Sequence, residues 1–180
     1  MIKKTIIVFA IFLAGCTSNK TLKHPLDKSK SKTVVLENGL KVYLLSDPNL
    51  NVSAASVSVE VGSLDNPDER QGLAHFLEHM LFLGTEKYPD VDEYSSYLKT
   101  YGGYSNAYTA SDHTNYQFQV LPDGFEGALD RFSQFFISPL FTEEYTAREV
   151  NAVNSEHQKN MLNDNWRQFR ISSLLSLIHI

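Results

Sequence analysis

Residues 72–85 read GLAHFLEHMLFLGT, and their apolar residues recur at the spacing of a helix. Within this stretch His75 and His79 are four positions apart, so a helix places both imidazoles on one face, close enough to bind one metal ion. Glu78 flanks that face, and its carboxylate can reach a water at the metal. The helix should present these three side chains on one side and bury its apolar residues on another. Those residues are Leu73, Phe76, Leu77, Met80 and Leu81.

The order His-x-x-Glu-His is the inverse of the His-Glu-x-x-His motif of zinc proteases, with the same two imidazoles and one carboxylate. Neutral imidazole is a good zinc ligand, and a carboxylate can take a proton from water if one coordination position stays open. A pattern of three residues is suggestive but not decisive, so the rest of the chain has to support it.

Two further segments support the motif, GGYSNAYT at 102–109 and EVNAVNSEHQKN at 149–160. Together the three segments resemble the pitrilysin/insulinase family of zinc metallopeptidases, over about residues 33–170. The resemblance implies one zinc ion, held by His75, His79 and Glu156, with Glu78 as the general base.

The resemblance also implies how substrate binds. In the family, the strand that matches residues 105–109 pairs with an extended peptide, and Asn106 and Ala107 would lie nearest the bond that is cut. Peptides are therefore the expected substrates.

The spacing of two glutamates supports the third ligand independently. Glu149 and Glu156 are seven positions apart, which is two helical turns, so they share a face of the helical stretch that begins near Thr142. One of them is enough to bind the metal. The resemblance favours Glu156 and leaves Glu149 to orient a ligand histidine. A solvated acidic face is the alternative interpretation.

The N-terminal residues 1–15 combine a basic start with an apolar run that is too short to span a membrane, which is typical of a secretory signal. The following LAGC at 13–16 resembles the bacterial lipobox, which implies that Cys16 becomes lipidated and binds the membrane. The alternatives are a plain signal peptide or a buried cysteine. Thr17 after the cysteine resembles lipoproteins of the outer membrane, so we expect an outer-membrane lipoprotein of the bacterial cell envelope that faces the periplasm.

Residues 16–32 are polar and basic, and we expect them to form a tether. A basic run can also bind nucleic acid. The net charge of the whole chain is −5, however, and the run lacks interleaved aromatic residues, so no nucleic-acid partner is expected.

The expected fold is α+β, an antiparallel-rich sheet packed against helices. Strands are expected at 34–37, 40–45, 52–61, 105–109 and 114–121, and helices at 92–101, 124–136 and beyond 142. Asn38-Gly39 predicts a tight hairpin between the first two strands, and Asp92 and Gly102-Gly103 should cap one helix.

Residues 33–180 are expected to form the N-terminal part of a catalytic domain. The resemblance fades over residues 172–180, and residues 174–180 form an apolar tail, which is either a genuine helix end or a sign of a truncated reading frame. Since members of the family are several times longer, we expect an incomplete domain and a second peptidase half that is absent from this chain.

The sequence therefore predicts a zinc metalloendopeptidase that is anchored to a membrane and hydrolyses peptides outside the cytoplasm. A non-catalytic fragment that binds peptides or partners is the alternative. A zinc-dependent quorum-signal lyase has a similar motif order, but the LAGC segment and the segment 149–156 disfavour it.

Overall fold

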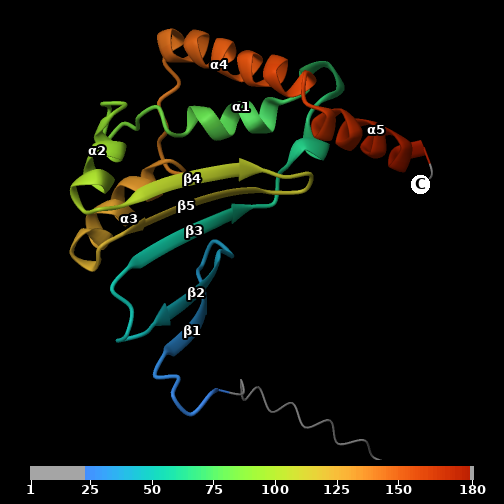
Figure 1. The fold of residues 1–180 in the computed structure, drawn as a ribbon. Coiled ribbons are helices and arrows are strands. Elements are labelled where there is room, and N and C mark those ends of the chain that lie inside the picture. The colour runs from blue at the N-terminus through green and yellow to red at the C-terminus, as the bar shows by residue number, and fades with distance from the viewer. Residues whose placement is uncertain (1–22, 179–180) are drawn as a thin grey trace, which may run out of the picture. The chain divides into compact units, whose positions relative to one another are not determined.

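The computed structural model describes residues 23–178, in two compact units that divide after Asn49 (Figure 1). In the first unit, strands β1 (Lys30–Val35) and β2 (Lys41–Ser46) form an antiparallel hairpin. The strand begins at Lys30 rather than at residue 34, so part of the predicted tether is extended and paired.

The predicted hairpin is confirmed, but its turn is not the expected two-residue one. The Gly39 N–H donates to the Leu36 carbonyl, and the Leu36 N–H donates to the Leu40 carbonyl, each at 2.9 Å. The loop therefore contains residues 37–39. A two-residue Asn-Gly turn needs positive φ at both residues, whereas only Gly39 adopts it, with a φ of 87°.

The second unit contains a three-stranded antiparallel sheet in the order β3-β5-β4. These strands are β3 (Ser53–Val59), β5 (Thr114–Val120) and β4 (Tyr104–Thr109). The central strand β5 buries every second side chain, which is the period of a strand with one face on the core. Because β4 lies at the edge of the sheet, one side of its backbone is open within this unit.

Two helices pack on the buried face of this sheet, α2 (Glu93–Thr100) and α3 (Phe125–Gln134). Three short 3-10 turns lie in the connections, η1 (Ser63–Asp65), η2 (Asp68–Arg70) and η3 (Pro122–Gly124). The core residues of the unit are Leu81, Tyr94, Leu98, Tyr116, Phe118, Val120, Ala128, Phe132 and Phe135.

The predicted caps of α2 are right at one end only. Its C-terminus closes with Gly102, whose N–H donates to Lys99, and Gly103, whose N–H donates to Leu98 at 2.7 Å. This is the expected glycine termination. The Asp92 side chain, in contrast, caps nothing. The backbone N–H of Asp92 donates instead to the Asp90 carboxylate, at 2.9 Å.

The motif helix α1 (Leu73–Met80) contacts β4 and α4 (Glu143–Met161), and in Figure 1 it runs between them. The predicted burial of α1 is partly wrong. Leu73 and Leu77 are 47% and 43% exposed, whereas Glu78 is only 7% exposed. The reason is that α1 turns its Glu78 side toward the sheet, so that a carboxylate takes a place that the pattern assigned to leucine.

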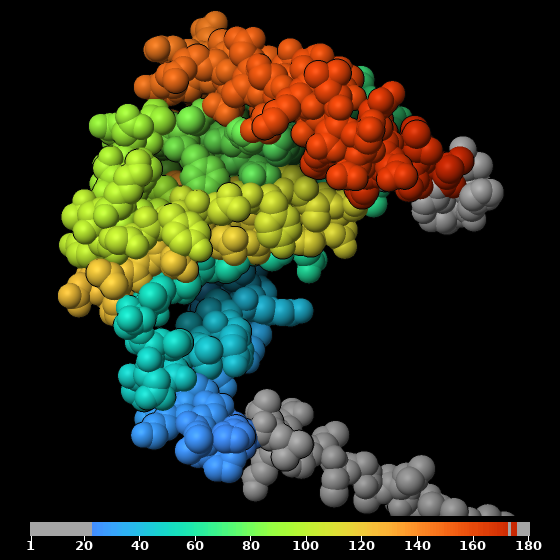
Figure 2. All heavy atoms as spheres, viewed as in Figure 1, coloured from blue at the N-terminus to red at the C-terminus, as the bar shows by residue number. Residues whose placement is uncertain are grey.

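The long helical stretch after residue 142 consists of two helices, α4 and then α5 (Asp164–Ile178), which includes most of the apolar tail. Figure 2 shows α5, in red, lying open on this face of the molecule. Its exposed apolar side chains are Trp166, Phe169, Ile171, Leu174 and Leu175. Among residues 23–178, no helix is both long and apolar enough to span a membrane. The predicted α+β fold is confirmed.

Candidate metal centre

Three potential ligand atoms face one another between α1 and α4. The Nε2 atoms of His75 and His79 are 3.2 Å apart, and the Oε2 atom of Glu156 lies 3.7 Å from the first and 3.8 Å from the second. Tetrahedral zinc with bonds of its usual length holds its ligand atoms about 3.3 Å apart. The triangle is therefore close to the size that such an ion needs, and two imidazoles with one carboxylate are a donor set that zinc accepts.

The local fold explains this arrangement. His75 and His79 are one turn apart on α1, and their rings meet edge to face with centroids 4.7 Å apart. Glu156 reaches them from α4. In the described part of the chain, this is the one cluster of three or more His, Cys, Asp or Glu side chains that is tight enough to hold a metal ion.

Glu149 lies two turns before Glu156 on α4 and contacts the other side of His79. Its Oε1 atom is 2.7 Å from His79 Nδ1. When Nδ1–H donates to this carboxylate, the lone pair of Nε2 is free to point toward the other two ligand atoms. The structure thus brings both glutamates to the histidines. Glu149 is the more buried, with 18% of its side chain exposed against 52% for Glu156.

The Glu78 carboxylate faces the sheet from α1. It is almost fully buried, and its Oε2 atom accepts a hydrogen bond of 2.6 Å from the Thr109 hydroxyl of β4. Tyr116 of β5 lies close enough to Glu78 to feel the charge of its carboxylate. Burial, with a smaller contribution from the charge of Glu78, raises the pKa of Tyr116 to about 12. Tyr116 therefore stays a neutral phenol at physiological pH.

Hydrogen bonding along β4 differs between Asn106 and Ala107. The Ala110 N–H donates to the His113 carbonyl at 2.8 Å, which closes the β4–β5 hairpin with a hydrogen-bonded pair. Since hydrogen-bonded and non-hydrogen-bonded pairs alternate, Asn106 exchanges backbone hydrogen bonds with β5, whereas the N–H and C=O of Ala107 point to the open edge. Asn106 instead exposes its side chain, on the sheet face away from the core.

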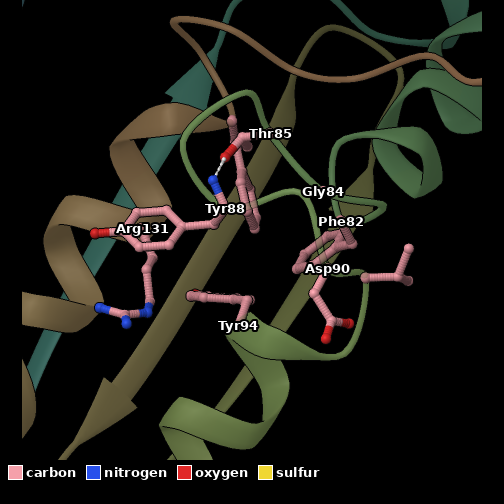
Figure 3. Close-up of a pocket in the computed structure, with 9 residues that line it drawn as sticks. Phe82, Gly84, Thr85, Tyr88, Asp90, Tyr94 and Arg131 are labelled. Atoms are coloured by element: carbon pink, nitrogen blue, oxygen red, sulfur yellow. Dashed lines mark hydrogen bonds between the residues drawn. The ribbon is translucent and has the colours of Figure 1, made fainter.

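A separate small cavity is lined by residues of the segment 82–91, which follows α1, together with Tyr94, Arg131 and Phe135 (Figure 3). Its volume is about 10 Å³, which is room for one water molecule, so it is too small for a peptide. Arg131 lies beside it, with its guanidinium over the rings of Tyr88 and Tyr97 and paired with Glu93 at 2.6 Å. These contacts are structural, and this cavity is not a substrate site.

Thr109 is the residue at this centre that sequence reasoning missed. It closes the segment GGYSNAYT, but threonine is common in strands, so its type alone gives no signal of a role. Only the register of β4 and the burial of Glu78 bring the two side chains together. Cys16, the predicted lipidation site, lies outside the described residues.

Comparisons with known proteins show the family to which the chain is similar. The sequence model of the family described as Insulinase (Peptidase family M16) matches residues 41–176. Human insulin-degrading enzyme is 53% identical over 153 residues, which are 85% of this chain and 15% of that protein. The A-factor-processing enzyme of Saccharomyces cerevisiae is 50% identical over 155 residues, which are 86% of this chain and 15% of the yeast protein.

A solved structure of a similar protein also supports the family assignment. The crystal structure of pitrilysin is similar with a TM-score of 0.73 and 40% sequence identity, over 81% of this chain and 15% of that one. The chain thus spans about 15% of the length of these relatives. The family match covers most of the chain and the fold agrees with it, so the resemblance seen in the three segments is confirmed: the chain belongs to the insulinase family of peptidases.

Proposed function

We propose that this chain provides the metal site and the general base of a zinc metalloendopeptidase. The observation that carries the proposal is the triangle of ligand atoms from His75, His79 and Glu156 beside the buried carboxylate of Glu78. Three protein ligands with a fourth position left open are typical of catalytic rather than structural zinc sites.

The side chains divide the work among them. When bound, zinc supplies Lewis acidity that polarises a peptide carbonyl and makes water a better nucleophile. Glu78 accepts the proton of the attacking water and then gives it to the nitrogen of the leaving amine. Glu149 keeps His79 in the tautomer whose Nε2 lone pair is available, because its carboxylate accepts a hydrogen bond from Nδ1–H.

Peptides are the proposed substrates, bound as an added strand on the edge of β4. The open N–H and C=O groups of Ala107 are suited to hydrogen-bond an extended peptide backbone, and the exposed Asn106 amide adds a polar contact nearby. Backbone pairing does not read side chains, so many sequences would bind. The names of the two relatives, which refer to insulin and to a-factor, are consistent with peptide substrates.

The test of this function is cleavage of an internally quenched peptide by the longest natural protein that contains this sequence, before and after removal of zinc. Hydrolysis that needs neither zinc nor Glu78 would contradict the proposal. A non-catalytic binding fragment is the second candidate, because the chain spans so little of its relatives' length. It predicts that peptide binds with no turnover under any zinc concentration.

Glu149→Ala is expected to lower zinc affinity by about 10-fold to 100-fold, the usual effect of removing the partner of a ligand histidine. Competition with a fluorescent zinc chelator measures this change. Glu144→Ala is the matched control, since Glu144 is an exposed acidic residue in the first turn of the same helix. Equal zinc affinities for the two variants would show that Glu149 does not support His79.

The location is also a proposal. The segment LAGC at 13–16 favours lipidation of Cys16, so that the protein is anchored in the outer membrane and acts in the periplasm. A second peptidase half, either later in the same polypeptide or on a partner, would close the substrate chamber. The relatives' greater length supports this part of the proposal.

Cys16→Ser is expected to move the protein from the membrane fraction to the soluble fraction or to block its processing, because several acyl chains hold a lipoprotein far more firmly than one chain does. Fractionation with immunodetection measures the change, and Ser18→Ala is a control next to the cleavage site. Mass spectrometry that finds an unmodified Cys16 in the mature wild-type protein would contradict the lipoprotein assignment.

A further inference from the structure

The two oxygens of the Glu78 carboxylate differ in their hydrogen bonding. Among residues 23–178, one side chain donates to it, the hydroxyl of Thr109, at 2.6 Å from Oε2. Within residues 23–178 no hydrogen bond uses Oε1, and this atom does not count among the buried side-chain atoms that lack a partner, so it is open to water. Because an unsatisfied buried charge is costly, a carboxylate oxygen without a protein donor is tolerated where water reaches it. Here one oxygen is held and the other is left without a protein donor.

Thr109 is itself held firmly in place. It lies on the core face of β4, opposite Thr114 of the central strand. The Thr114 hydroxyl donates to the Val61 carbonyl at 2.8 Å and lies 3.5 Å from Thr109 Oγ1. Threonine is β-branched, so its χ1 is restricted on a strand. The sheet thus sets the position of the Thr109 side chain, and its hydroxyl donates to Glu78 on the neighbouring helix.

We propose that Thr109 is a positioning residue for the general base. Its hydroxyl holds Oε2 of Glu78, which leaves Oε1 as the oxygen that accepts the proton from water. This inference rests on the function proposed above and goes beyond it, because it identifies what orients the base.

The same strand also ties the base to the substrate. Ala107, whose backbone points to the open edge, is two residues from Thr109, so both belong to one face of β4. A peptide paired with this edge is placed in register with β4, whose Thr109 donates the hydrogen bond to Glu78. Thr109 thus connects the position of the bound peptide to the position of the base, through a rigid element and not a loop.

The test compares Thr109→Val, which keeps the shape but removes the hydroxyl, with Thr109→Ser, which keeps it. In the longest natural protein that contains this sequence, the valine variant should lower kcat about 10-fold to 100-fold, as expected for loss of a hydrogen bond to a charged group and misplacement of a base. KM and zinc content should stay within about twofold of the parent, since neither ligands nor the edge of β4 change. The serine variant should keep kcat within about threefold.

A structural readout accompanies the kinetics. A crystal structure of the valine variant should show the Glu78 carboxylate rotated from the position where Oε2 meets the Thr109 hydroxyl. Thr85→Val is the matched control. Thr85 is fully buried, whereas Thr109 is half-buried, and the Thr85 hydroxyl accepts a hydrogen bond of 3.2 Å from the Tyr88 N–H at the cavity shown in Figure 3. It should affect thermal stability but not kcat.

The outcomes separate this inference from the proposed function. If Glu78→Gln is inactive but Thr109→Val keeps the parental kcat, the positioning role is wrong and the proposed function stands. Glu78→Gln with the parental rate overturns the proposed function. In the Glu78→Gln background, Thr109→Val should cause no further loss, since both changes act on one group. If the valine variant does not fold, Thr109→Ala against Thr109→Ser gives the same comparison, and equal kcat values for this pair overturn the inference.

Discussion

Glu78→Gln is expected to slow peptide hydrolysis by about a hundredfold or more, the usual contribution of a general base. Glutamine keeps the size of the side chain, and its amide oxygen can still accept the hydrogen bond from Thr109. It cannot take a proton from water. Because Glu78 is only 7% exposed, solvent cannot easily supply another base in its place. The loss should appear in kcat, with zinc content unchanged.

The measurement is steady-state cleavage of a quenched peptide, together with metal analysis of the same preparation. Glu86→Gln is a suitable control, because Glu86 is an exposed glutamate that follows the motif helix, and its backbone N–H donates to the Ser138 carbonyl at 3.0 Å. Near-normal turnover by the Glu78 variant would exclude Glu78 as the base. Loss of zinc from that variant would instead assign it a role in metal binding.

The arrangement of the metal ligands follows from simple helical geometry. An i, i+4 pair must share a face of α1, and two glutamates seven apart must share a face of α4, whatever the helices pack against. Sequence spacing is therefore enough to predict each pair. That the two pairs meet depends on the tertiary fold, for which the family resemblance supplied the expectation.

The burial of α1 shows where sequence patterns fail. Leucine predicts burial on average, but a short helix between an edge strand and another helix has two covered sides and no single apolar face. Leu73 and Leu77 remain exposed, and Glu78 turns to the sheet because the Thr109 hydroxyl satisfies it there. The same limit applies to the turn at Gly39, whose conformation depends on hydrogen bonds that a dipeptide does not specify.

His75→Ala and Glu156→Gln should each weaken zinc binding by more than the 10-fold to 100-fold that loss of a supporting residue causes, because each removes an atom of the ligand triangle. His157→Ala is the matched control, since this exposed histidine adjoins Glu156 and is not part of the triangle. The proteins are stripped with a chelator and titrated with zinc, and both bound metal and the thermal midpoint are measured.

Zinc that binds the folded chain and not the unfolded one raises the melting temperature, so this test does not depend on activity. The parent and the His157 variant should gain stability as zinc is added, and hydrolysis should return with about one zinc per chain. The His75 and Glu156 variants should gain little at the same zinc concentration. If both of these variants keep stoichiometric zinc, the 3.2 Å approach of the two Nε2 atoms reflects something other than a shared metal ion, and the assignment of the centre is wrong.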